Sequence, residues 1–184
     1  MRTTEYFMDS RNFAIFEFAM PVVHFTFHAY RGWRESHPRG YIQRGARGVQ
    51  PPSPGLERHR SRVASDRPVR FEPARTRRLL TEWIVEIATT EDWRVHGVVV
   101  TPTHIHLVMS WVEGELREVA ARLKRILGVR LAREFDTPGR TWFARGWGAR
   151  RLANREHLAY LLEVYLPKHQ QHEAGVLWTE FDGS

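Results

Sequence analysis

Residues 93–111 read WRVHGVVVTPTHIHLVMSW, the strongest strand signal in the chain. Two apolar runs rich in β-branched residues, 93–100 and 104–111, flank the short turn 101–103, which contains a proline. Such a pair of runs around a tight turn predicts a β-hairpin. Because both runs are apolar along most of their length, we expect the hairpin in the centre of an antiparallel sheet.

Elements outside this hairpin predict an α+β fold. Upstream, VVHFTFHA at 22–29 alternates in a way that is typical of a strand. Apolar residues recur at helical spacing in 72–90 and 115–134. A last helix is expected over 154–166, because an asparagine opens it and Pro167 interferes with its continuation. The expected architecture is an antiparallel β-sheet of four or five strands with helices packed on one face.

Composition excludes several classes of protein. The 184 residues suffice for one domain with a sizeable core, since 42% of them are hydrophobic. There is no cysteine, which excludes a disulfide framework, a thiolate zinc site and a cysteine nucleophile. No stretch of about 18 uncharged apolar residues predicts a membrane span. The apolar run 13–20 contains Glu17 and is followed by no small-residue cleavage site, so we expect no export.

We divide the chain into three parts. Residues 1–20 are expected to form a weak N-terminal leader, 21–178 a single domain, and 179–184 a C-terminal tail. Within the domain, glycines, prolines and eight arginines set apart 39–70, which is predicted to be a long basic loop. This loop is interpreted either as a solvated insertion without a role or as an arm that neutralises phosphates.

The charge balance points to a polyanionic partner. The formal net charge is +7, and arginine carries nearly all of the positive charge because Lys124 and Lys168 are the only lysines. A GC-rich genome would produce this arginine bias without any function. A basic protein nevertheless attracts polyanions, so nucleic acid is the favoured partner and an anionic membrane surface a weaker one.

Two histidines, His104 and His106, are the candidate metal ligands. They lie two residues apart on a predicted strand, so both imidazoles project from one face. A place among apolar residues beside a proline turn is costly for two polar rings, which favours divalent metal binding over surface histidines. The first strand also carries His24 and His28, which we interpret as an exposed or half-buried face, and His96 receives no role.

With these residues identified, PTHIHLV at 102–108 resembles the His-hydrophobic-His core of the single-tyrosine transposases in the HUH endonuclease superfamily, which include the REP-associated tyrosine transposases. The strand VHFTFHAY at 23–30 and the segment WFARGW at 142–147 are similar to other parts of that family. The resemblance covers about residues 22–178. It implies the ferredoxin-like plait and a metal-dependent enzyme that nicks and joins single-stranded DNA through a 5′-phosphotyrosine, using one Mg²⁺ or Mn²⁺ ion.

Two tyrosines compete for the role of nucleophile. The family pattern places a Gln or Asn, the third metal ligand, about four residues after the tyrosine. From Tyr165 that position is His169, whereas from Tyr160 it is Val164, which cannot ligate a metal. The resemblance therefore implies Tyr165 as the nucleophile and His169 as the third ligand, and we interpret Tyr160 as a core aromatic.

Three positions depart from the family pattern. Thr103 stands where Asn is common, Pro167 falls inside the turn that separates Tyr165 from its partner, and His169 replaces an amide. His172 is close enough in sequence to be a rival ligand. Because of these departures, a domesticated protein of the same fold that binds a DNA or RNA hairpin without cutting it is the main alternative. A metal-dependent phosphodiesterase that activates water is the third hypothesis.

The resemblance also implies the partners. The DNA would be single-stranded with hairpin or palindromic ends, in the bacterial cytoplasm and at the nucleoid. Relatives include monomers and dimers, so a homodimer stays open. Trp33, Trp142 and Trp147 are candidates for stacking on unpaired bases. The residues expected to contact the nucleic acid are Arg145, Arg150, Arg151, Lys168 and Gln170.

Overall fold

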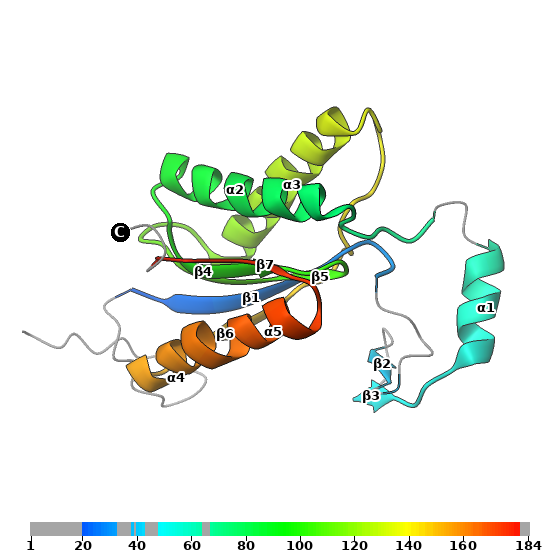
Figure 1. The fold of residues 1–184 in the computed structure, drawn as a ribbon, viewed down its shortest axis with the longest axis horizontal. Coiled ribbons are helices and arrows are strands. Elements are labelled where there is room, and N and C mark those ends of the chain that lie inside the picture. Colours follow the sequence, from blue (N-terminus) through cyan, green and yellow to red (C-terminus); the bar gives the residue numbers. More distant parts are fainter. Residues whose placement is uncertain (1–19, 33–37, 39, 43–47, 64–66, 181–184) are drawn as a thin grey trace, which may run out of the picture.

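A five-stranded antiparallel sheet forms the centre of the molecule (Figure 1). The computed structural model describes residues 20–32, 38, 40–42, 48–63 and 67–180. The strand order is β6-β1-β5-β4-β7, and every neighbouring pair is antiparallel. The strands are β1 (Val22–His28), β4 (Arg94–Val100), β5 (His104–Ser110), β6 (Gly148–Arg151) and β7 (Val176–Thr179).

The connections between these strands are those of a ferredoxin-like plait. Helix α2 (Ala74–Thr90) links β1 to β4, and α3 (Leu116–Glu134) links β5 to β6. In each case the two linked strands are parallel and one antiparallel strand lies between them. The predicted α+β class with an antiparallel sheet is confirmed, and so is the position of the β4–β5 hairpin in its interior.

Alternation along the strands divides the core into two layers. Phe25 and Phe27 of β1, with Ile105 and Leu107 of β5, are fully buried on the face that α2 and α3 cover. Helix α3 begins at a capping box. The Glu115 side chain accepts a hydrogen bond from the backbone N–H of Glu118, and the Glu118 side chain accepts one from the backbone N–H of Glu115.

The C-terminal helices cover the opposite face of the sheet, whereas we predicted helices on one face only. Figure 1 shows α4 and α5 below the sheet, with α2 and α3 above it. The C-terminal segment buries Leu161, Leu162 and Leu166 against Val99 and Val108. Burial of these side chains holds the segment against the strand that carries His104 and His106.

The C-terminal segment continues through Pro167, where we expected it to end. It comprises α4 (Arg155–Tyr160), a π-helical turn (Leu161–Tyr165) and α5 (Leu166–His172). Asn154 caps its start as predicted, because the side chain accepts from the backbone N–H of His157 at 3.0 Å. The Leu166 N–H bonds to the Leu161 carbonyl, five residues back, and this wider turn gives the proline ring room that an α-helical turn denies it.

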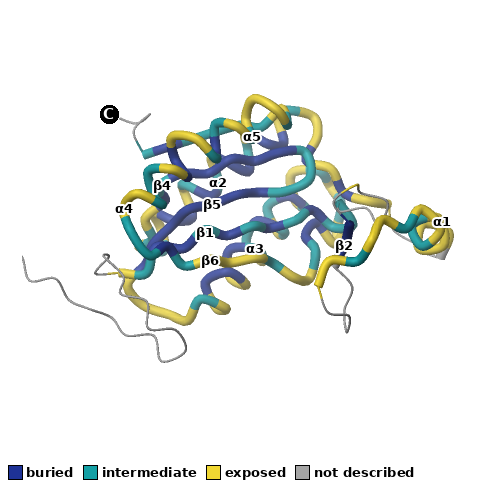
Figure 2. Tube along the Cα trace, turned by 90° about the horizontal axis from the view of Figure 1, so that it is seen from below, coloured by how far each residue is buried: buried dark blue, intermediate teal, exposed yellow. Residues whose placement is uncertain are grey.

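The predicted basic loop 39–70 contains regular structure. Strands β2 (Tyr41–Ile42) and β3 (Val49–Gln50) pair with each other, and α1 (Pro54–Val63) follows them. Figure 2 shows α1 as mostly exposed, in contrast to the buried strands β1 and β5. The helix lacks the apolar periodicity that would have predicted it because it buries almost nothing.

Two short edge strands also differ from expectation. From its tryptophans and glycines, 140–153 is expected to form a short hairpin or an ordered loop, and its residues 148–151 instead add β6 to the edge of β1. Residues 176–179 add β7 beside β4, so the predicted tail 179–184 begins inside a strand. Residues 1–19 of the predicted leader lie outside the described residues. Among the helices that are described, none has the length and apolar character needed to cross a bilayer.

Candidate metal centre

His104 and His106 project from one face of β5, as the alternation predicts. Their ring centroids lie 4.6 Å apart, and the rings meet nearly edge to face. His106 is buried and His104 is half-buried. The face is the one covered by the C-terminal helices, so the two imidazoles are enclosed between the sheet and that segment.

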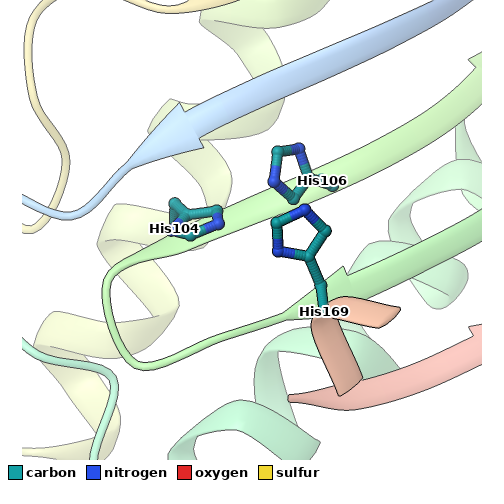
Figure 3. A group of neighbouring side chains, drawn as sticks. All are labelled: His104, His106 and His169. Carbon is teal, nitrogen blue, oxygen red and sulfur yellow. The ribbon is translucent and has the colours of Figure 1, made fainter. Parts of the chain in front are cut away.

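His169 reaches the pair from α5 (Figure 3). Its ring centroid lies 4.4 Å from that of His106 and 5.6 Å from that of His104. One nitrogen from each of the three residues lies within 4.8 Å of the other two, which is close enough for all three to hold one metal ion. The structure thus brings together the three predicted ligands, whereas the rival His172 is exposed on α5.

The buried Nε2 atom of His106 has no hydrogen-bond partner within the described part of the chain. Leaving such an atom without a partner costs about 1–3 kcal/mol. The other nitrogen, Nδ1, lies 3.1 Å from His24 Nε2 and 3.2 Å from Thr26 Oγ1. A proton on Nδ1 therefore has two acceptors within reach, and the Nε2 lone pair remains for a metal ion.

A similar arrangement orients His104. Its Nδ1 lies 3.2 Å from Thr101 Oγ1 and 3.0 Å from Thr103 Oγ1. The Thr101 hydroxyl donates its proton to the carbonyl of His104, so towards Nδ1 its oxygen acts as an acceptor. This favours the tautomer in which Nδ1 carries the proton and Nε2 carries the lone pair. Thr103 thus supports the ligand that follows it in the sequence.

Burial keeps these imidazoles neutral. Loss of solvent lowers the pKa of His104 to about 4, against an opposing effect of Glu173. For His106, burial together with the neighbouring histidines holds the pKa far below its usual range. Burial also lowers the pKa of His24 to about 4 and lowers that of His28. Neutral imidazoles at pH 7 have lone pairs available for a cation, as a metal site requires.

Tyr165 lies against this cluster. Its ring centroid is 4.6 Å from that of His169, 5.2 Å from that of His106 and 5.4 Å from that of His24. Tyr160 is 50% exposed and is therefore not the core aromatic that we expected. Of the two candidate tyrosines, only Tyr165 packs against the candidate metal ligands.

The predicted nucleic-acid contacts divide between the two faces of the sheet. Arg150 is the register partner of His24, and its charge contributes to the lowered pKa of that histidine. Arg151 is the register partner of Val23 and therefore lies on the other face, away from the cluster. The remaining three residues are exposed, namely Arg145, Lys168 and Gln170.

Of the three stacking candidates, Trp142 is buried and packs against Phe135, which leaves no ring face for a base. Trp147 is half-buried and lines a cavity. Trp33 lies outside the described residues.

Sequence reasoning missed three participants. His24 and His28 are half-buried as expected, but they contact the cluster, at His106 and at His104 respectively. Glu173 was not singled out, and its carboxylate touches both His104 and His169. The helical spacing of four between His169 and Glu173 is the signal that could have found it. His96 lies elsewhere, with Ser110 and Glu180.

Comparisons with protein-family models and with curated proteins find no match. Among solved structures, a REP-associated tyrosine transposase bound to a REP hairpin is similar to this chain. The match has 11% sequence identity and a TM-score of 0.45, and it covers 90% of this chain and 74% of the other. The similarity is one of fold.

Proposed function

We propose that the protein cuts and rejoins single-stranded DNA at hairpin-flanked sites, as a transposase does, with Tyr165 as the nucleophile. His104, His106 and His169 would hold one divalent ion. The observation that carries the proposal is the packing of the Tyr165 ring against His106 and His169, two of the three candidate ligands. The sequence resemblance of 102–108 to the His-hydrophobic-His core supports the same function.

The three histidines fit a divalent ion. The Nε2 atom of His106 is buried without a partner within the described residues. Burial lowers the pKa of His104 and of His106, and each of these two rings is held by a hydrogen bond at its Nδ1. When bound, the ion supplies positive charge that polarises a backbone phosphate and stabilises the charge of the pentacoordinate phosphorane.

The chain's own contribution begins at the Tyr165 hydroxyl. Its oxygen attacks the phosphorus of a backbone diester, the bond from phosphorus to the 3′ oxygen breaks, and a 5′-phosphotyrosine and a free 3′-OH result. The phenol proton leaves to solvent and the departing 3′ oxygen takes up a proton. Because one phosphodiester replaces another, rejoining requires no nucleotide cofactor.

Positive charge beside the cluster would hold the DNA strand. Arg150 lies on the site face next to His24, and Lys168 and Gln170 lie on α5 beside His169. A cavity of about 530 Å³ opens at His28 and is lined by Arg31, Trp147 and three glycines. An indole beside a cavity of this size suits an unpaired base.

Covalent trapping tests the proposal. Single-stranded oligonucleotides with imperfect hairpins, taken from the DNA that flanks the gene, are incubated with the protein and Mn²⁺ and separated on denaturing gels. We expect a protein–DNA adduct that disappears with Tyr165→Phe and persists with Tyr160→Phe, the matched control on the same helical segment. His106→Ala should also remove the adduct while sparing most of the binding.

The other outcomes identify the alternatives. Tight binding without an adduct on any hairpin would favour a non-catalytic hairpin-binding protein of the same fold. Cleavage that persists in Tyr165→Phe and leaves no adduct would instead favour a phosphodiesterase that activates water.

A further inference from the structure

Glu173 follows the last residue of α5, and its carboxylate lies between two of the candidate ligands. One oxygen, Oε1, lies 2.9 Å from His169 Nδ1, and the other, Oε2, lies 3.5 Å from His104 Nε2. The Glu173 side chain is 38% exposed, whereas those of His104 and His169 are 13% and 18% exposed. The carboxylate therefore closes the cluster on its solvent side.

The contact between Glu173 and His104 indicates a positive charge between the two side chains. Thr101 favours the tautomer that leaves a lone pair on His104 Nε2, and a carboxylate oxygen faces that atom. Two electron pairs that face each other at this distance repel unless a positive charge lies between them. Two donor atoms bound to one metal ion at about 2.1 Å lie about 3 to 3.4 Å apart. The separation of His104 Nε2 from Glu173 Oε2 is close to that range.

We propose that Glu173 is a fourth ligand, and that the resulting set of three imidazoles and one carboxylate selects a transition metal ion, Mn²⁺, Co²⁺ or Zn²⁺, over Mg²⁺. Imidazole nitrogen suits transition metals, whereas Mg²⁺ prefers an octahedron of oxygens and retains its water. Glu173 is also the acidic member of this set, and its carboxylate oxygen is a harder ligand than the imidazole nitrogens. The inference rests on the metal site of the proposed function and not on its DNA chemistry.

Metal binding without DNA tests this inference separately from cleavage. Chelator-treated protein is titrated calorimetrically with Mn²⁺, Zn²⁺ and Mg²⁺. We expect Mn²⁺ and Zn²⁺ to bind at least tenfold more tightly than Mg²⁺. Glu173→Gln should weaken Mn²⁺ and Zn²⁺ binding by about 10- to 100-fold. Glu163→Gln, an exposed carboxylate on the same C-terminal segment, is the matched control and should leave both affinities unchanged.

The visible absorption of the Co²⁺-loaded protein separates ligation from support. Loss of a carboxylate ligand changes the coordination of Co²⁺, so the spectrum of Glu173→Gln should differ from that of the wild type and of Glu163→Gln. Melting of the metal-free variants checks that they fold. An unchanged spectrum and affinity in Glu173→Gln would overturn the role of Glu173, and Mg²⁺ binding as tight as Mn²⁺ binding in the wild type would overturn the selectivity. Either result would leave the adduct experiment to judge the proposed function.

Discussion

His24 Nε2 lies 3.1 Å from His106 Nδ1 and joins the first strand of the sheet to the most deeply buried of the candidate ligands. Thr26, two residues further along β1, approaches the same nitrogen at 3.2 Å. Strand β1 thus supplies the partners that fix the tautomer of a ligand on β5. A metal ligand held through its second nitrogen keeps its lone pair aimed at the ion.

Removing these partners should weaken metal binding. We expect His24→Ala to lower Mn²⁺ affinity about tenfold, and His24→Ala with Thr26→Val to lower it about 100-fold, because the double variant leaves Nδ1 of His106 without an acceptor. Calorimetric titration of metal-free protein measures both. His96→Ala, on β4 and away from the cluster, is the control; equal affinities in all four proteins would contradict the role of β1.

The metal-free protein should become less stable as the pH is lowered. The pKa of His24 and of His104 is about 4 in the folded chain, against about 6.5 when unfolded. Between these values the unfolded chain binds protons that the folded chain does not. The free energy of unfolding should therefore decrease as the pH drops from about 6.5 to 4, by about 1.4 kcal/mol per pH unit and group.

Urea unfolding at several pH values measures this slope. His104→Asn should reduce it, because one of the low-pKa groups is removed. Stability that stays constant between pH 6.5 and 4.5 would show that these imidazoles are not held neutral by burial.

Two glycines should respond in opposite directions to alanine. A Cβ on Gly97 of β4 would lie 2.7 Å from a methyl carbon of Leu162 and 2.9 Å from one of Leu166, so Gly97→Ala must shift these two buried side chains of the segment that carries Tyr165. We expect a loss of about 1–3 kcal/mol in the free energy of unfolding. Gly128 in α3 has open space around it, and Gly128→Ala should add about 0.5–1 kcal/mol.

Thermal and urea unfolding compare the two glycine variants directly. A Gly97→Ala variant as stable as the wild type would mean that the C-terminal segment is seated loosely on the sheet.

Trp147 should contribute to binding of single strands. If a base enters the cavity beside His28, Trp147→Ala removes its stacking partner and weakens binding of a single-stranded oligonucleotide by about 1–3 kcal/mol. Fluorescence anisotropy measures the affinity, and duplex DNA of the same sequence shows whether the loss is specific to unpaired bases. Trp83→Ala, a half-buried tryptophan packed against the core at α2, is the control.

Substitutions in the basic helix α1 test whether the insertion 39–70 is an arm that neutralises phosphates, one of the two interpretations of that segment. Arg58 and Arg62 are exposed on it and line a surface hollow with Ser61. Replacing both with Gln should weaken DNA binding and make the slope of log affinity against log salt shallower by about one to two, because fewer counterions are released. An unchanged slope would identify the insertion as solvated and without a role in binding.

The sequence alone determined the elements whose signals are local. Alternation predicted β1, β4 and β5, helical spacing predicted α2 and α3, and the His-x-His pattern placed His104 and His106 on one face. These features depend on residues only a few positions apart, so the sequence of one strand or one helix is enough to predict them. The same holds for Asn154, whose capping bond joins residues three apart.

Only the tertiary structure determined which segments far apart in the sequence contact each other. The short edge strands β6 and β7 have too few residues to carry a period, and α1 buries too little to show one. Pro167 signals the end of a helix when read locally, yet a π-helical turn and the burial of Leu161, Leu162 and Leu166 carry the segment through it. That continuation brings Tyr165, His169 and Glu173 to β5. Spacing along the chain relates Tyr165, His169 and Glu173 to one another, but burial and pairing across the sheet select their contacts with β5, which no spacing encodes.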